Sequence, residues 1–532
     1  MATTTSACCG SAATPAPAAA TSAPTSGACC GDPIPVAETG ACCSEPSATC
    51  GCQSKARTSD AGDTVPAARG ANGAPRDATS GRLPVAVVGA GPIGLAAAAH
   101  LLEKGETPVV FEAGDAVGAS IRQWAHVRLF SPWKYLVDPA ARRLLEAAGW
   151  TMPDGDRLPT GGELVAGYLE PLAAHPAIAP HLRLGERVVA VSRRGFDKVK
   201  SKGREEAPFE LVVRLPGGST RRVLARAVVD ATGTWLAPNP LGAGGLPAEG
   251  EREHAERIHY GIPDALGRDR AAYAGRRTLV VGSGHSAFNA LLDLAALAEE
   301  APGTEVVWAV RRAEVGQMFG GGAKDQLEAR GALGTRLERL VATGRVRLVT
   351  GFRAERVRAL GDALGDALAV EGDDGRSIAP VDRIVVATGF RPDLSLAREL
   401  RLNIDPWLEA PERLAPLVDP NVHSCGTVYP HGAAELSHPE KDFYVVGMKS
   451  YGRAPTFLML TGYEQVRSVA CALTGDEEGA RNVELVLPET GVCQTDIGGS
   501  LGGSLGGSCC STAEESVSLS RPLSRAPSLA HA

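Results

Sequence analysis

Short runs of apolar, often β-branched residues recur between residues 84 and 475, and longer segments of helical composition separate them. The runs have the length of buried strands, and the alternation of strands with helices predicts a mostly parallel sheet. Residues 93–103, rich in alanine and leucine, predict the helix that follows the first strand. The predicted strands are 85–88, 109–111, 228–229, 279–281, 306–310, 383–386 and 443–446.

The two ends of the chain differ from this pattern. Residues 1–80 consist mainly of small residues and proline, and residues 491–532 contain the repeat GGSLGGSLGGS. Such segments bury too little apolar surface to offset the entropy lost on ordering, so we expect two disordered tails.

The composition narrows the class of protein. Hydrophobic residues make up 44% of the chain, as in soluble globular proteins, and the net charge of −7 argues against a nucleic-acid binder. No apolar run is long enough to span a bilayer, so no membrane partner is expected. The N-terminus has no signal-peptide pattern, which predicts a cytoplasmic protein with reduced thiols.

A first glycine-rich turn lies between strand 85–88 and helix 93–103. Gly89-Ala-Gly91-Pro-Ile-Gly94 has the G-x-G-x-x-G spacing, in which glycines allow a tight bend and close approach of a pyrophosphate to the helix N-terminus. Glu112 follows the next strand, where a carboxylate accepts hydrogen bonds from a ribose. The context favours a dinucleotide site over a turn that only packs the helix.

A second turn, Gly282-Ser-Gly284-His-Ser-Ala287, repeats the pattern in its G-x-G-x-x-A form. The strand after it ends in Arg311 and Arg312 and carries no acid. Guanidinium groups pair with a 2′-phosphate that a carboxylate would repel, which predicts NADPH rather than NADH. The alternative is a pair of solvated surface arginines. Two such turns indicate an internal duplication, with one unit inserted in the other.

Two more motifs, Asp230-Ala-Thr-Gly233 and Ala387-Thr-Gly-Phe390, each follow an apolar strand. They resemble the turns at which two-dinucleotide flavoproteins pass from one nucleotide domain to the other. Over residues 84–475 the chain is similar to the flavin-containing monooxygenase-like group, which shares its architecture with thioredoxin reductase and the lysine and ornithine N-hydroxylases. The block 442–469 and the cysteine pairs narrow the resemblance to the flavin monooxygenase-like proteins of bacterial arsenic-resistance operons.

The resemblance implies an α/β fold with two Rossmann-like, three-layer domains, the NADPH domain being inserted in the FAD domain. The expected limits are a disordered Cys-rich tail at 1–80, the first part of the FAD domain at 81–265, the NADPH domain at 266–380, the second part of the FAD domain at 381–490, and a Gly/Ser-rich tail at 491–532.

The resemblance also implies which residues bind the two cofactors. Arg122 and Trp124 would lie in the loop beside the flavin, Val188 against the adenine, and Gly447 before a helix at 455–461 whose N-terminus faces the flavin pyrimidine. The FAD cradle and the first crossover would comprise Gly89, Gly91, Pro92, Ile93, Gly94, Glu112, Ala231, Thr232 and Gly233. The NADPH residues would be Gly282, Gly284, His285, Ser286, Ala287, Arg311, Arg312, Thr388 and Gly389.

One segment departs from the family pattern. Members usually carry F-x-G-x-x-x-H before the NADPH domain, whereas residues 253–259 keep only His259. His259 either serves the same structural role or is a satisfied linker histidine. The departure puts the family's usual route of monooxygenation in question.

The chemistry implied by the resemblance is reduction of FAD by NADPH and formation of a C4a-hydroperoxyflavin with molecular oxygen. This species oxygenates a soft nucleophile, such as a thiol or a trivalent arsenical, and needs few catalytic side chains. The weak candidates are Asn289, which we interpret as a helix-facing polar residue, and Cys425, a lone thiol or a small buried residue. A disulfide reductase is the alternative, but the sequence contains no C-x-x-C dithiol.

Ten of the 13 cysteines form closely spaced pairs in the tails, and the others are Cys425, Cys471 and Cys493, the last of which also falls within 491–532. Thiolates are soft ligands, so we hypothesise that the tails capture a trivalent arsenical and concentrate it near the flavin. Alternatively, the cysteines bind zinc or copper(I), or they have no ligand and are incidental. An alternative function outside the enzymes is sequestration of a metalloid by a protein that keeps the flavoprotein fold as a scaffold. The tail cysteines are Cys8, Cys9, Cys29, Cys30, Cys42, Cys43, Cys50, Cys52, Cys509 and Cys510.

Overall fold

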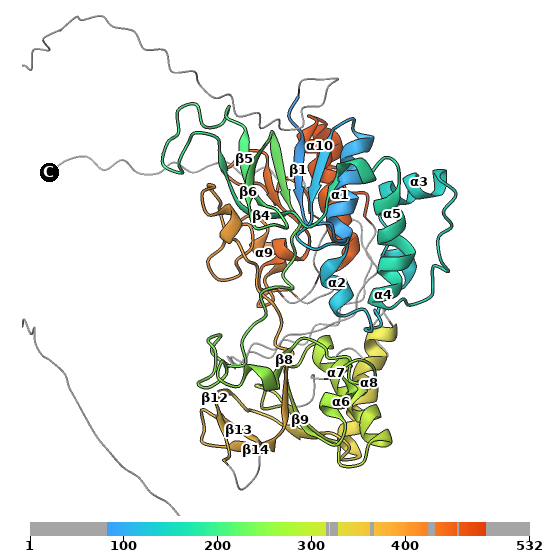
Figure 1. Cartoon of the computed structure of the whole chain (residues 1–532), viewed down its shortest axis with the longest axis vertical. Coiled ribbons are helices and arrows are strands. Elements are labelled where there is room, and N and C mark those ends of the chain that lie inside the picture. Colours follow the sequence, from blue (N-terminus) through green and yellow to red (C-terminus); the bar gives the residue numbers. More distant parts are fainter. Residues whose placement is uncertain are drawn as a thin grey trace, which may run out of the picture. The chain divides into compact units, whose positions relative to one another are not determined.

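The computed structural model describes residues 82–314, 319, 328–361, 367–423, 431–454 and 457–485. These residues form two layered units, each built on a five-stranded parallel sheet (Figure 1). The predicted tails, 1–80 and 491–532, lie outside them. None of the helices in the described ranges combines the length and the apolar character that crossing a bilayer requires.

The first parallel sheet has the strand order β16-β7-β1-β2-β3. Its central strands are apolar runs with every residue buried, as expected of strands covered on both faces. The bounds are β1 Val85–Val88, β2 Pro108–Phe111, β3 Leu182–Arg183, β7 Ala227–Asp230 and β16 Phe443–Val445.

Helices cover one face of this sheet and a small antiparallel sheet covers the other. Val85, Val87 and Val110 pack with the helices α1, α3 and α10, and Figure 1 shows α1 beside α10. The opposite face packs against β4, β5 and β6. The bounds are α1 Pro92–Glu103, α3 Pro139–Ala147, α10 Met459–Leu473, β4 Arg187–Arg193, β5 Phe209–Arg214 and β6 Thr220–Ala225.

The second parallel sheet, in the order β11-β10-β9-β15-β8, repeats this arrangement. One face packs against the helices α7 and α8, and the other against the antiparallel strands β12 to β14. The bounds are β8 Ile258–Tyr260, β9 Arg277–Val281, β10 Glu305–Ala309, β11 Arg347–Val349, β12 Ala354–Ala359, β13 Leu368–Gly372, β14 Ser377–Val381, β15 Arg383–Val386, α7 His285–Glu300 and α8 Glu328–Ala342.

The duplication predicted from the two glycine turns is thus present strand for strand, and both units have the predicted three layers. The second sheet extends past the expected limits 266–380 on both sides. Its edge strand β8 precedes residue 266, and β15, which pairs with β9 and β8, follows residue 380. The inserted unit therefore begins and ends with strands of its own sheet.

The remaining helical segments are short and lie in the connections. They are α2 Ala119–Gln123, η1 Trp133–Tyr135, α4 Gly161–Leu164, η2 Val165–Leu169, α5 Glu170–Ala174, η3 Ala179–His181, η4 Ala255–Arg257, α6 Arg270–Tyr273, η7 Ser395–Ala397, α9 Ala415–Val418, η8 Gly447–Tyr451 and α11 Glu477–Arg481.

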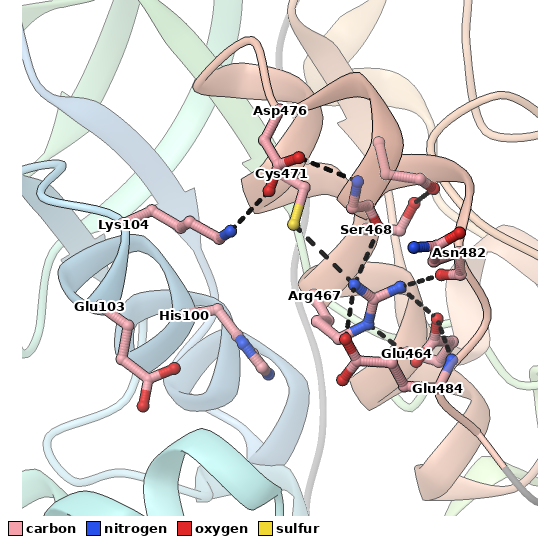
Figure 2. A network of polar contacts seen from close by, with 12 residues as sticks. His100, Glu103, Lys104, Glu464, Arg467, Ser468, Cys471, Asp476, Asn482 and Glu484 are labelled. Carbon is pink, nitrogen blue, oxygen red and sulfur yellow. Dashed lines mark hydrogen bonds and ion pairs between the residues drawn. The ribbon is translucent and has the colours of Figure 1, made fainter.

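A polar network ties the C-terminal end of α10 to α1 and α11 (Figure 2). Arg467 is 2.6 Å from Glu464 within α10, and its guanidinium also donates to the sulfur of Cys471 at 3.8 Å. Lys104, at the end of α1, pairs with Asp476 at 2.7 Å. These contacts fix the last described helices against the helix that follows the first glycine turn.

Candidate dinucleotide sites

The glycine turn 89–94, with the first turn of α1, is called the first cradle, and the turn 282–287, with the first turn of α7, the second. The first cradle requires glycine at two of its three glycine positions. Gly89 has φ +102°, and a Cβ there would lie 2.7 Å from the carbonyl oxygen of Ala231. A Cβ on Gly94 would overlap the carbonyl of Gly89, so the helix can pack against the turn only without a side chain. A Cβ on Gly91 would meet no protein atom within 4 Å. The middle glycine thus faces open space, where a bound pyrophosphate would approach the backbone.

The N-terminus of α1 is available to an anion. Gly91 is its N-cap residue and supplies no side-chain hydrogen bond to the first turn. Pro92 begins the helix, where its missing N–H costs no hydrogen bond. The remaining first-turn N–H groups and the helix dipole favour negative charge at this position. The residues therefore fit the pyrophosphate of a dinucleotide.

Glu112 is fixed beside the cradle by two backbone groups. Its carboxylate accepts from the N–H of Ala90 and the N–H of Gly114, both at 2.8 Å. A carboxylate has further lone pairs, so these bonds leave room for a ribose hydroxyl. The N–H of Glu186 donates to the Glu112 carbonyl, which brings the start of β4 and the buried Val188 near the same strand end.

The second cradle repeats the geometry of the first. Gly282 has φ +139°, and its Cβ would overlap the carbonyl of Ala387, just as Gly89 lies against Ala231. Gly284 faces open space and is the N-cap of α7, again without a side-chain cap. In both units the first glycine is required because it backs onto the ATG turn of the neighbouring strand.

The two sites differ in the residues that follow the strand after each cradle. Glu112 is the first residue after β2, and Val310 is the first after β10, with the same register relative to the glycine turn. Val310 is buried and apolar. Arg311, exposed, and Arg312, half-buried, follow it, and one Arg311 nitrogen donates to the carbonyl of Ala243 at 3.2 Å. The second unit therefore has an apolar residue and then two arginines where the first unit has the Glu112 carboxylate.

The first turn of α7 contains the other predicted NADPH residues. His285 begins the helix and Ser286 follows it, while the Ala287 side chain is fully buried where the first cradle has Gly94. The amide nitrogen of Asn289 donates to the carbonyl of His285 at 2.9 Å. This bond holds the Asn289 side chain along its own helix.

The ATG turns begin the two crossovers between the units. In the first, the Thr232 hydroxyl donates to Asp230 at 2.7 Å, and Gly233 has φ +66°. In the second, the Thr388 hydroxyl donates to the carbonyl of Asn239 at 3.1 Å, and Gly389 has φ +93°. The Thr388 side chain, in the second crossover, thus donates a hydrogen bond to the backbone of the first crossover.

Aromatic residues follow both ATG turns, and their rings lie close together. The ring of Trp235, which follows the first ATG turn, is centred 4.9 Å from that of Phe390, which follows the second. Trp235 is also 6.4 Å from Trp124, whose ring lies against Gly161. Arg122, in α2 just before Trp124, is exposed, donates to the carbonyl of Val117 and pairs with Glu170. Trp124 therefore belongs to the aromatic group, whereas Arg122 faces solvent.

Gly447 lies directly against the first cradle. It has φ +70°, and a Cβ there would lie 3.2 Å from Ile93 of the glycine loop. Gly462, in the first turn of α10, also packs on Ile93. Helix α10 starts at Met459, within the predicted segment 455–461, of which 455 and 456 lie outside the described residues.

Two buried polar residues of this region were not predicted from sequence. Lys449 forms an ion pair with Asp230, and Gln465 accepts the Gly447 N–H at 2.7 Å. A lysine three residues after the apolar strand 443–446 was the available signal, because a buried charge requires a partner.

His259 lies in β8 and pairs in the ladder with Val385 of β15. Burial lowers its pKa from the ordinary value. It is therefore a strand residue of the second sheet.

The cysteine predictions fall largely outside the described residues. Cys425 and the ten tail cysteines, namely Cys8, Cys9, Cys29, Cys30, Cys42, Cys43, Cys50, Cys52, Cys509 and Cys510, all lie there. Cys471 is described as a buried free thiol, and burial raises its pKa. Within the described ranges no group of three or more metal-ligating side chains is present.

Comparison with known proteins supports the two nucleotide sites. An NAD(P)-binding Rossmann-like domain model matches residues 87–148. Rice (Oryza sativa subsp. japonica) indole-3-pyruvate monooxygenase YUCCA1 is 31% identical over 215 residues, which cover 39% of this chain and 44% of that protein. Arabidopsis thaliana flavin-containing monooxygenase FMO GS-OX-like 5 is 28% identical over 237 residues, 41% of this chain and 49% of that protein. The chain thus spans less than half the length of each of these relatives.

Among solved structures, the bacillithiol disulfide reductase Bdr (YpdA) from Bacillus cereus superimposes with a TM-score of 0.53 at 20% identity. The match covers 74% of this chain and all of that one, which establishes the shared fold. A family model described as pyridine nucleotide-disulphide oxidoreductase matches residues 174–441, half of the chain. The chain therefore belongs to the pyridine nucleotide-disulphide oxidoreductase family, with FAD and NAD(P)H as the cofactors of its two domains.

Proposed function

We propose that this chain is an NADPH-dependent flavin monooxygenase that oxygenates a soft nucleophile, a trivalent arsenical or a thiol. The observation that carries the proposal is two complete dinucleotide cradles in a chain whose sequence contains no C-x-x-C dithiol. Flavin disulfide reductases most often carry such a redox pair beside the flavin, whereas an oxygenating flavin needs none. The names of the two plant relatives favour the same choice.

The chain's own residues bind and orient the cofactors. The first turn of α1 takes the pyrophosphate of FAD and Glu112 takes its ribose. The first turn of α7 takes the pyrophosphate of NADPH, and Arg311 and Arg312 pair with its 2′-phosphate. When bound and reduced, FAD supplies the activation of molecular oxygen. The start of α10, packed on Ile93, places a positive helix end near the flavin.

The cysteine-rich tails supply the substrate in this proposal. Ten thiols in two low-complexity segments are soft ligands suited to trivalent arsenic. Tethering raises the concentration of captured arsenical around the flavin without any new contact in the folded unit. The biological role that follows is arsenic resistance, carried out in the cytoplasm, where thiols stay reduced.

The test is product formation by the purified full-length, FAD-loaded protein. NADPH, a proton, oxygen and substrate should yield NADP⁺, water and the oxygenated substrate, with the new oxygen atom derived from ¹⁸O₂. We expect methylarsenite, arsenite or a simple thiol to stimulate NADPH oxidation only in air. Anaerobic NADPH oxidation driven by a disulfide would instead identify a reductase, and tight arsenical binding without turnover a sequestering protein.

Two variants test the tails separately from the chemistry. Removing 1–80 and 491–532, or replacing the ten tail cysteines by serine, should raise the KM for arsenicals by about tenfold. The flavin content and the kcat at saturating substrate should not change. An unaltered KM in both variants would contradict the capture role while leaving the monooxygenase proposal intact.

A further inference from the structure

A buried ion pair lies beside the ATG turn of the first cradle. The Lys449 ammonium is 2.6 Å from Asp230 and 2.9 Å from the Thr232 hydroxyl. The two charged side chains are 1% and 0% exposed. A buried ion pair is weak evidence for stability, because desolvation of both charges offsets most of their attraction. Because stability does not explain why this pair is present, its position next to the first cradle suggests a role in binding the cofactor.

Asp230 shapes the turn that backs the first glycine. One carboxylate oxygen accepts from the N–H of Thr232 at 3.1 Å and from its hydroxyl at 2.7 Å. The other oxygen accepts from Lys449. Ala231, the next residue along the chain, lies against Gly89. The conformation of the ATG turn, and with it the fit of the glycine loop, is thus fixed by one carboxylate.

Lys449 belongs to η8, which follows β16, and β16 lies next to β7 in the first sheet. Gly447, at the start of η8, packs on Ile93, and its N–H donates to Gln465. Since a backbone N–H can only donate, the Gln465 oxygen must face Gly447 and its NH₂ must face Ser450, 2.9 Å away. The segment Gly447–Tyr451 is therefore held in one conformation by buried groups.

The charge of Lys449 also reaches the returning crossover. Hydrogen bonds from Ser395 lower the pKa of Asp393, and the Lys449 charge adds to this effect. Asp393 follows the second ATG turn by a few residues. The ammonium group thus contacts the first ATG turn directly and acts on the segment after the second one only through its charge.

We propose that Lys449 is a positioning residue for FAD. By joining the turn Ala231–Gly233 to Gly447–Tyr451, it makes the two segments that contact the glycine loop a single clamp. FAD affinity then depends on this bridge itself, beyond its effect on the stability of the fold. The inference rests on FAD binding at the first cradle and is independent of the substrate proposed above.

The test separates bridging from stability with a single and a double variant. Lys449→Met leaves a buried unpaired carboxylate and should lower both the Tm of the apoprotein and the FAD affinity. Asp230→Asn combined with Lys449→Met removes both charges, so the Tm should return to within about 2 °C of the native value. The bridge is still missing, so the FAD dissociation constant should remain raised by about tenfold.

The matched control is Glu464→Gln combined with Arg467→Met, which removes another buried ion pair, on α10 (Figure 2). FAD titrations at a temperature where all variants are folded should give this control a dissociation constant within about twofold of the native protein. If the double variant at 230 and 449 regains native FAD affinity together with native Tm, the pair is only structural and the proposal fails.

Hydrogen exchange of the native protein supplies a test that needs no variant. If the bridge couples the two turns, residues 231–233 and 447–451 open together, and FAD should raise their protection by the same factor. Different protection factors for the two turns would overturn the proposal, whatever the variants show.

Discussion

Val310 occupies in the second sheet the position that Glu112 occupies in the first. Both are the first residue after the strand that follows the glycine turn, and the strand registers agree. The carboxylate of Glu112 is fixed by two backbone N–H groups, whereas Val310 is buried in the core and two arginines follow it. One architecture thus presents a fixed carboxylate in one copy and two arginines in the other.

Replacing Arg311 and Arg312 by alanine should abolish the preference for NADPH. Loss of charge-assisted hydrogen bonds to the 2′-phosphate should raise the KM for NADPH by about 10- to 100-fold, while the KM for NADH stays the same. Steady-state NAD(P)H oxidation measures this. Arg353→Ala, an exposed arginine of the same unit, is the control. An unchanged ratio would identify the two arginines as ordinary surface residues.

The two cradles should fail independently. Gly89→Ala forces a side chain at φ +102° onto the Ala231 carbonyl, so the purified protein should lack flavin and be colourless. Gly282→Ala should leave the protein yellow but block anaerobic flavin reduction by NADPH, followed by absorbance. Gly344→Ala, at φ +72° with open space around it, controls for backbone strain alone. A colourless Gly282→Ala protein would contradict the assignment of the cradles.

Glu112→Gln should weaken FAD binding without preventing folding. The Ala90 and Gly114 N–H groups bond different oxygens of the carboxylate, and in the variant one of these oxygens is an NH₂ group that cannot accept. The variant also loses the charge-assisted hydrogen bond proposed between the carboxylate and the ribose, which costs about 1.5–3 kcal/mol and should raise the FAD dissociation constant about 10- to 100-fold in a fluorescence titration. Glu146→Gln, in an exposed pair on α3, should have no effect. Native affinity in the Glu112 variant would remove this residue from the site.

Asp293, in α7, should make the stability of the protein depend on pH. Burial, with a contribution from Asp264, raises its pKa to about 6, opposed by Arg336. The native state therefore binds this proton more tightly than the unfolded state. The stabilisation is complete below the unfolded pKa, near pH 4, and is lost as the pH rises through about 6.

Asp293→Asn should consequently raise the Tm by a few degrees at about pH 8 and have little effect at about pH 4. Thermal unfolding across this range measures the difference. A Tm difference that does not change with pH would show that Asp293 is not the titrating group.

The two glycine turns can be recognised in the sequence because their pattern is local. Gly89 and Gly282 occur at fixed distances from an apolar strand and a helix, and Arg311 follows its strand directly. Every long parallel strand of the two sheets was likewise predicted, since a fully buried strand must be an apolar run. These features need no knowledge of distant contacts.

The sheet to which a strand belongs is a different matter. Arg383–Val386 is an apolar run that fits either parallel sheet equally well, and β8 is too short to show a pattern. The expected limits 266–380 therefore excluded both strands from the second unit. The Lys449–Asp230 pair joins residues more than 200 positions apart, and no local pattern specifies such a contact.

The backing of each first glycine by an ATG turn has a consequence for protein engineering. The polypeptide leaves both sheets through the turns that support the cofactor loops, so a cut, an inserted domain or new chain ends at either crossover would disturb a cofactor directly. The hairpin between β5 and β6, closed at residues 215–219 by its own hydrogen bonds, has no such neighbour. Circular permutation should be tolerated there and fail at the crossovers.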